Sequence, residues 1–286
     1  MHNIKRCRVN PISFLVVSLF SVTTVFAEGE TTNPNSDLTL NEDQPCLICQ
    51  LSGSASLAYD SNLYDKDDYR SVRNLSWNGT LNYPVSEQLR AFITGGGYRV
   101  FQDKTGTYVT DTVVGLNYSN LFTFGETGRL GLGGQLTIPT SEASRDTELY
   151  TAFRLSVPVS FKMLGGNYSV SPRLRKNFYK YQTMNGRVLT EWVYSVSADG
   201  HYQFDKLTLG ASLLGGNGTS YKGNRSREFN YAASVYSNYQ ISDSWLASFT
   251  VSSAGFYSDA ERGTLGNLDL FDTDKASYIA QLTYSF

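Results

Sequence analysis

Acid–base chemistry in this chain would depend on one histidine, His201, because the only other histidine is His2 near the start of the sequence. Asp199 and Ser197 precede His201 at alternate positions, so the residue types of a hydrolytic triad follow one another along the chain. Alternate residues of a strand share a face but stand about 7 Å apart, which is too far for a direct Ser–His hydrogen bond. We therefore expect a structural or solvated histidine and no enzyme.

Two cysteines, Cys46 and Cys49, form the second candidate, in the segment PCLICQ at 45–50. In an oxidising compartment this spacing favours a small disulfide loop. A thioredoxin-type redox pair would need a helix that starts at the motif. A metal site would need further ligands, and the one histidine that follows the cysteines, His201, is far from them in the sequence. Two free thiols or a bond to a partner's thiol remain as alternatives.

No metal site and no cofactor are predicted, because the sequence holds no H-E-x-x-H motif, dense Cys/His cluster or nucleotide-binding loop. Carboxylate pairs such as Asp67 with Asp68, or Asp272 with Asp274, fall in turn-rich segments. We interpret them as solvated loop residues.

The elements that must position such residues alternate between apolar and polar side chains, which is the period of a β-strand. Leu75, Trp77 and Leu81 form one such stripe, and Leu149, Phe153 and Leu155 form another; both are predicted to face outward. Helical spacings of three and four are missing. Twelve strands are predicted, at about 50–60, 73–83, 89–100, 109–119, 128–138, 148–161, 167–178, 189–203, 207–216, 229–240, 245–257 and 276–286.

The connections between these strands alternate in length. Segments such as YPVSE (83–87) and FDK (204–206) are short, whereas PTSEASRDT (139–147) and the segment 258–275 are long and charged. Outer-membrane barrels combine tight periplasmic turns with longer external loops. The even strand number then predicts that both termini are periplasmic. The segment 120–127 is predicted to be a turn that is longer and more aromatic than its peers.

The N-terminus predicts export. Lys5, Arg6 and Arg8 precede an apolar stretch that ends at the small-residue site Val25-Phe26-Ala27, which is typical of a Sec signal peptide cleaved after Ala27. Cleavage removes three of the 24 Lys and Arg and none of the 26 Asp and Glu, which leaves a formal charge of −5 and no reason to expect a nucleic-acid partner. Residues 28–49 are polar and acidic, and are predicted to be a disordered leader that carries the cysteine pair.

The C-terminus carries the clearest signature. In YIAQLTYSF (278–286), Tyr284 and the final Phe286 share the face of the other apolar residues. This ending, with the signal peptide and the alternating strands, resembles Gram-negative outer-membrane β-barrels, porin-like proteins included, over residues 50–286. The resemblance implies an all-β antiparallel transmembrane barrel that contacts outer-membrane lipid and lipopolysaccharide. It also implies that barrel-insertion machinery recognises Tyr284 and Phe286. A secreted β-sandwich is the soluble alternative.

A barrel of twelve strands has a backbone radius of about 12 Å, which permits a narrow lumen. A charge facing lipid near mid-wall costs about 2–4 kcal/mol for arginine, so charged residues that alternate with apolar ones are assigned to the lumen. The predicted lumen-lining residues are Arg90, Asp111, Arg129, Arg154, Arg173, Arg175, Glu191 and Asp199. Arg154 is expected near Arg173 and Arg175, and Glu191 close to Arg175.

This basic patch has two interpretations. It is a constriction that attracts polar or anionic solutes, or an ion-pair network that plugs and stiffens the barrel. We accordingly predict a small, selective diffusion or export channel. The alternatives are a closed barrel whose external loops bind a surface partner and, less favoured, a lipid-modifying enzyme that uses His201.

Overall fold

The computed structural model describes residues 51–68, 70–102, 105–226, 228–258, 273 and 276–286. The predicted signal peptide, the predicted leader and the cysteines Cys46 and Cys49 lie outside the described residues. Within them the chain is almost entirely β-structure, with one short helix. No helix among these residues has the length and apolar character needed to cross a bilayer.

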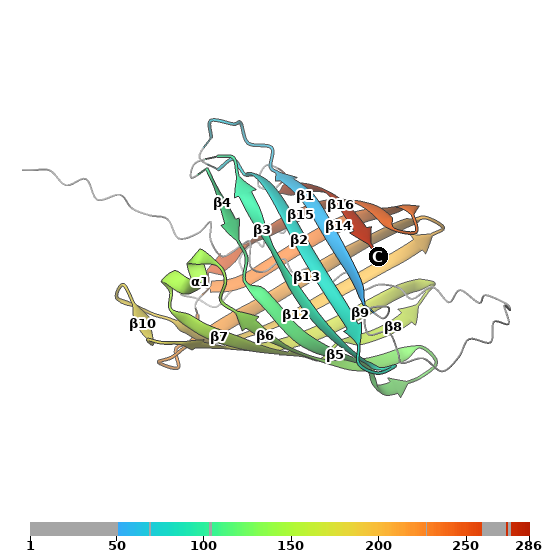
Figure 1. Ribbon diagram of the computed structural model, residues 1–286, viewed down its shortest axis with the longest axis horizontal. Helices are drawn as coiled ribbons and strands as arrows, with labels where there is room; N and C mark the ends of the chain where they lie inside the picture. The colour runs from blue at the N-terminus through green and yellow to red at the C-terminus, as the bar shows by residue number, and fades with distance from the viewer. Residues whose placement is uncertain (1–50, 69, 103–104, 227, 259–272, 274–275) are drawn as a thin grey trace, which may run out of the picture. The chain divides into compact units, whose positions relative to one another are not determined.

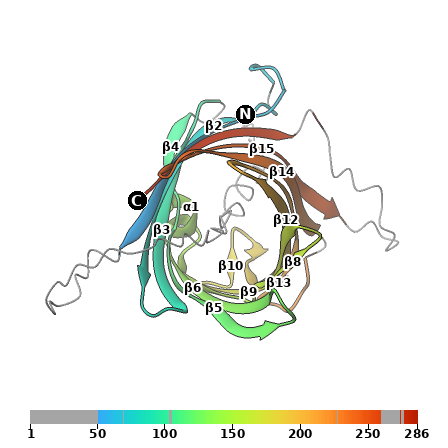
Figure 2. The same ribbon diagram turned by 90° about the vertical axis from the view of Figure 1, so that its right-hand side faces the viewer.

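The strands form one closed antiparallel ring (Figures 1 and 2). The wall consists of β1 Ser52–Ser61, β2 Arg73–Pro84, β3 Leu89–Val100, β5 Thr112–Phe124, β6 Gly128–Ile138, β7 Leu149–Ser156, β8 Val159–Met163, β9 Gly166–Tyr179, β12 Thr190–Phe204, β13 Leu207–Ser220, β14 Glu228–Ser242, β15 Trp245–Ser258 and β16 Ser277–Ser285. The ring is closed because β1 pairs with both β2 and β16, and β12 pairs with both β9 and β13. The prediction of an antiparallel barrel of twelve strands is confirmed, with β7 and β8 sharing one wall position.

The interruption between β7 and β8 has a local cause. Both strands pair with β6 on one side and β9 on the other, and only Val157 and Pro158 separate them. Proline has no N–H to donate to a neighbouring strand, so it interrupts a ladder. Gly131 N still donates to Pro158 O (2.8 Å), which keeps the wall continuous.

The two ends of the barrel differ as the connection lengths predict. The end that carries Gly53 and Phe286, which exchange two backbone hydrogen bonds, also holds the short turns, and we call it the terminal end. The opposite, loop end holds the long connections and the small elements β4 Gly106–Val109, α1 Glu142–Asp146, β10 Thr183–Met184 and β11 Arg187–Val188. That the terminal end is periplasmic stays a prediction.

The outward face of the wall is apolar around the whole ring. One apolar side chain on each wall position is between 39% and 56% exposed: Leu57, Trp77, Ile93, Leu116, Leu136, Phe153, Leu174, Val196, Leu213, Val235, Phe249 and Leu282. Full burial of one such side chain is worth about 1.5–3 kcal/mol, so a continuous exposed belt requires a surrounding apolar phase.

The described residues contain no conventional hydrophobic core. Their buried apolar residues are alanines and Leu149, and no large side chain is fully buried. A β-sandwich would fill its centre with large inward side chains. The sandwich alternative is therefore wrong for this chain.

Two local predictions need correction. The segment 120–127 is not a long turn: β5 continues to Phe124 after a register shift between Tyr118 and Phe122, and only three residues connect it to β6. Leu149 does not face outward, because a shift between Leu149 and Thr151 interrupts the alternation, and Leu149 is buried.

Two groups of aromatic rings lie on the outer face at the terminal end. Trp245 lies 5.0 Å from Tyr284, and Tyr284 lies 6.2 Å from Phe286, measured between ring centroids. On the far side of the ring, the Tyr168 and Tyr202 hydroxyls lie 2.8 Å apart. Tyrosine and tryptophan suit a boundary between lipid and water because the ring is apolar and the tip is polar.

Candidate functional site

Four arginines, Arg129, Arg154, Arg173 and Arg175, lie on the inner face of β6, β7 and β9, and we call this group the arginine sector. The strand register places Arg154 opposite Arg175, whereas Arg173 lies opposite Ser156 on the same face. Their neighbours Leu155 and Leu174 face outward. This is the adjacency that the sequence predicts, and it follows from the two-residue alternation of paired strands.

The arginine sector has few polar partners. Arg175 Nε donates to Asn177 Oδ1 (2.8 Å), and Asn177 Nδ2 donates to Thr190 O (3.0 Å), so one guanidinium is held in place. None of the ion pairs found among the described residues includes a member of the sector. A guanidinium has five donors, so most donors of the sector have no protein partner among the described residues.

Glu191 departs from its predicted place. Its carboxylate pairs with Lys176 Nζ at 3.2 Å, not with Arg175. Lys176 lies between Leu174 and Phe178 in alternation, on the outward face, and its ammonium lies 4.7 Å from the centroid of the Trp192 ring. The reason is an irregularity of β12 between Thr190 and Trp192, which breaks the alternation on which the prediction depended.

Arg90 lies at the terminal end of the inner face. It is paired with Pro84 on β2 and with Asn117 on β5. Asn117 lies opposite Gly133, where a Cβ would meet Asn117 Oδ1 at 2.9 Å and Ser156 Oγ at 2.4 Å. The backbone register thus connects Arg90 to the arginine sector through small and polar residues.

Asp199 lies on the inner face of β12, but its neighbours hold it. Tyr236 Oη donates to Asp199 Oδ2 (2.9 Å), and Asp199 Oδ1 lies 3.2 Å from His201 Nδ1. Tyr236 reaches across β13 because Gly210 lies between them, where a Cβ would stand 2.3 Å from the Tyr236 ring. Sequence alternation could not identify Tyr236 as the partner of Asp199, since the two residues are 37 positions apart in the sequence.

Around Asp199 the inner wall is rich in serine. The register aligns Ser169, Asp199, Ser212, Ser234, Ser252 and Ser277 across β9 and β12 to β16. Ser212 Oγ and Ser234 Oγ lie 2.6 Å apart. We call the inner face of β12 to β16 the hydroxyl sector.

Asp111 lies at the loop end, just before β5, and binds the connection between β6 and β7. Its two carboxylate oxygens accept hydrogen bonds from Ser141 N (2.9 Å) and Ser144 Oγ (2.6 Å). Ser141 is also the N-cap of α1, since its side chain accepts from Ser144 N. A serine followed by Glu142 is a helix-start signal that strand alternation alone misses.

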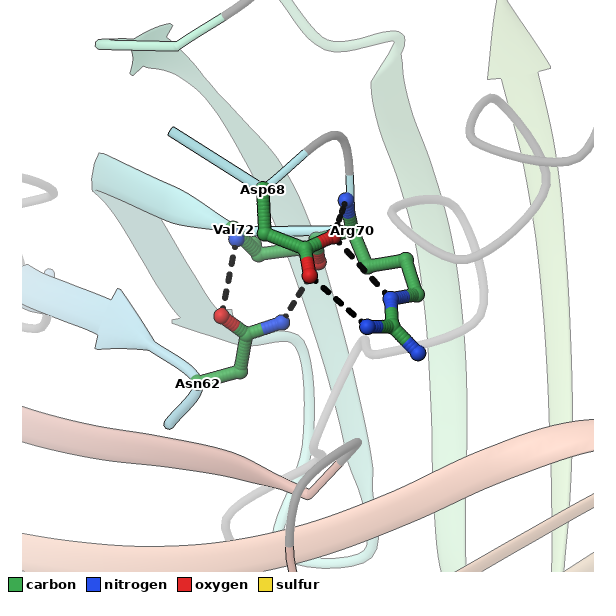
Figure 3. Close-up of polar contacts among 4 residues, drawn as sticks. All are labelled: Asn62, Asp68, Arg70 and Val72. Atoms are coloured by element: carbon green, nitrogen blue, oxygen red, sulfur yellow. Dashed lines mark hydrogen bonds and ion pairs between the residues drawn. The ribbon is translucent and has the colours of Figure 1, made fainter. Parts of the chain in front are cut away.

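Side-chain hydrogen bonds also tie the connection between β1 and β2 (Figure 3). Asn62 is buried; its Nδ2 donates to Arg70 O (2.7 Å), and its Oδ1 accepts from Val72 N (2.9 Å). Arg70 forms an ion pair with Asp68 at 2.7 Å. The hydrogen bonds and charge of Arg70 lower the pKa of Asp68 from its ordinary 3.8 to about 2.

Comparisons with known proteins agree with this fold. No protein-family model and no curated protein sequence matches the chain. An outer-membrane channel of Pseudomonas putida F1 is 13% identical, with a TM-score of 0.57 over 82% of this chain and 95% of that one. The NanC porin is 12% identical, with a TM-score of 0.53 over 81% of this chain and 98% of that one. The chain thus has the fold of the bacterial outer-membrane β-barrels, the class that its C-terminal sequence resembles.

Proposed function

We propose that this barrel is a small, selective diffusion or export channel for polar or anionic solutes. The observation that carries the proposal is the arginine sector, whose guanidinium groups form no ion pair among the described residues. Fixed charge of one sign along a narrow lumen raises the local concentration of the opposite ion. An ion-pair network, the plugging interpretation, would instead pair each arginine with a carboxylate.

The test is the current through the refolded mature protein in planar bilayers. Under a salt gradient we expect a reversal potential that indicates anion preference, and we expect the triple variant R154Q/R173Q/R175Q to lose most of it. The control is K66Q/K206Q/K222Q, which removes the same charge from exposed residues outside the wall. Equal anion preference in both variants would contradict the proposal.

The second candidate is a closed barrel whose loops bind a surface partner. The structured β1–β2 connection, closed by Asn62, favours it (Figure 3). A protein that shows the heat-modifiable gel shift of a folded barrel but never conducts would support this candidate and contradict the channel.

We further propose that the barrel is not an enzyme. Both carboxylate oxygens of Asp199 are engaged, by Tyr236 and His201, and none of the hydrogen bonds among the described residues joins Ser197 to His201. The measurement is lipid hydrolysis by the parent and by His201→Ala. Activity that the parent has and the variant lacks would overturn this proposal.

A further inference from the structure

The inference concerns α1, the short helix in the connection between β6 and β7. Figure 2 shows α1 within the outline of the ring when the barrel is viewed along its length. Asp111, which binds this connection, alternates with the inward-facing Val113 and Gly115 and so belongs to the inner face. Glu142 of α1 also acts electrostatically on Tyr98, an inner residue of β3. The helix therefore lies on the lumen side of the wall.

A second group of hydrogen bonds holds the start of the same connection. Thr140 Oγ1 donates to Thr110 O (2.9 Å) and accepts from Thr112 N (2.9 Å). Together with the two bonds to Asp111, these fix Thr140, Ser141 and Ser144 against the residues that lead into β5. All of these contacts are polar.

Packing does not hold α1 in place. It has five residues and none of them is buried. A helix of this length is unstable by itself in water, because nucleation costs more than one turn of hydrogen bonds returns. Its position therefore depends on the hydrogen bonds made by Asp111 and Thr140, which we call the anchor; Asp111 is its charged member.

The anchor stands beside the arginine sector. The Asp111 carboxylate acts electrostatically on Arg175 and on Tyr179, both on β9. The far end of the same connection is tied to the neighbouring loop, where Lys180 Nζ lies 2.8 Å from Glu148 Oε2 and Lys180 N donates to Glu148 O (2.9 Å). The loop end next to the arginine sector therefore carries both α1 and the contacts that tie its connection to the wall.

We propose that Asp111 is a positioning residue that holds α1 over the lumen and so sets the width of the channel at its loop end. Asp111 acts through the helix and does not itself select the solute. The inference rests on the proposed channel function, because an entrance has a width only where solutes pass.

The decisive variants are Asp111→Ala and Ser144→Ala, which remove the two sides of one hydrogen bond. We expect Asp111→Ala to raise single-channel conductance about two-fold and to admit larger polyethylene glycols, with a smaller change of the same sign for Ser144→Ala. The control is Asp205→Asn in the turn between β12 and β13, at the terminal end. Asn tolerates the positive φ of Asp205, and the variant should behave as the parent.

A label tests the anchor independently of current. A spin label on Ala143→Cys, in a protein whose Cys46 and Cys49 are replaced by serine, should become more mobile when Asp111→Ala or Ser144→Ala is added. Ser144→Ala keeps the Asp111 carboxylate and serves if Asp111→Ala does not refold.

The outcomes separate the two proposals. A conducting parent whose conductance and label mobility do not change in either variant overturns the role of Asp111 and leaves the channel intact. A folded parent that carries no current overturns the channel, and the width-setting role with it.

Discussion

The arginine sector and the hydroxyl sector lie on the inner face of the same wall, but they differ in whether their polar side chains have protein partners. In the hydroxyl sector, Asp199 is held by Tyr236 and His201, and Ser212 lies next to Ser234. In the arginine sector, Arg154 and Arg175 lie opposite each other, and neither forms an ion pair with a carboxylate among the described residues. Polar groups that satisfy one another stabilise the barrel, whereas like charges left unpaired are available to solutes.

Both sectors should face water, and the residues that alternate with them along each strand should face lipid. Val235 and Ser234 are neighbours on β14, with Val235 on the outward face and Ser234 in the hydroxyl sector. We expect Val235→Arg to cost about 2–4 kcal/mol more in unfolding free energy than Ser234→Arg, because only the first places a charge in the bilayer. Urea unfolding in lipid vesicles measures this difference. Equal costs would break the assignment of faces.

A stability test of the hydroxyl sector comes next in size. Tyr236→Phe removes the donor to Asp199 and should lower the unfolding free energy by about 1–2 kcal/mol, with the reversal potential unchanged. Tyr239→Phe, on the outward face of the same strand, is the matched control and should have little effect. If Tyr236→Phe changed selectivity instead, the hydroxyl sector would share the role we give to the arginines.

The arginine sector should show the reverse behaviour. Arg154→Gln removes a charge that faces Arg175, so repulsion falls and the unfolding free energy should change by less than about 0.5 kcal/mol. The reversal potential should move measurably toward cation preference. A large loss of stability without a shift in potential would instead support the plugging interpretation.

The smallest expected effect lies outside both sectors, in the connection between β1 and β2. It is a loss of local stability at acid pH. The pKa of Asp68 is lowered to about 2 by Arg70, so the Asp68–Arg70 contact stabilises the β1–β2 connection above pH 3.8 and is lost as the pH falls toward 2. Hydrogen-exchange protection of the Val72 amide should decrease over this range, and Asp68→Asn should remove the pH dependence. Protection that holds below pH 2 would show that Asn62 alone closes the connection.

The C-terminal segment was predictable from the sequence alone. Tyr284 and Phe286 stand in strict alternation, and their place on the outer face follows from that pattern. The same is true of Arg154, Arg173 and Arg175, because regular strands joined by short connections have one register that keeps the alternate apolar residues, such as Leu155 and Leu174, on the outward face. Whether these arginines select solutes, and whether Tyr284 and Phe286 direct assembly, stay predictions.

Sequence reasoning failed wherever the strands are irregular or the contact joins distant strands. Glu191 lies at an irregularity of β12, so the two-residue alternation predicted Arg175 as its neighbour, whereas it pairs with Lys176. The anchor of α1 joins Asp111 to residues about thirty positions later, and the Tyr236–Asp199 contact needs Gly210 between them.

The sequence by itself determined the compartment-specific architecture, the number of strands and the sign of the charge on one side of the lumen. These follow from a local period of two, and a local period can be read without knowing which strands meet. Only the tertiary structure decided that Asp199 is held, that Glu191 pairs with Lys176 and that Asp111 binds the connection between β6 and β7. Each of these depends on how the strands pair, which sets side chains from separate elements within bonding distance.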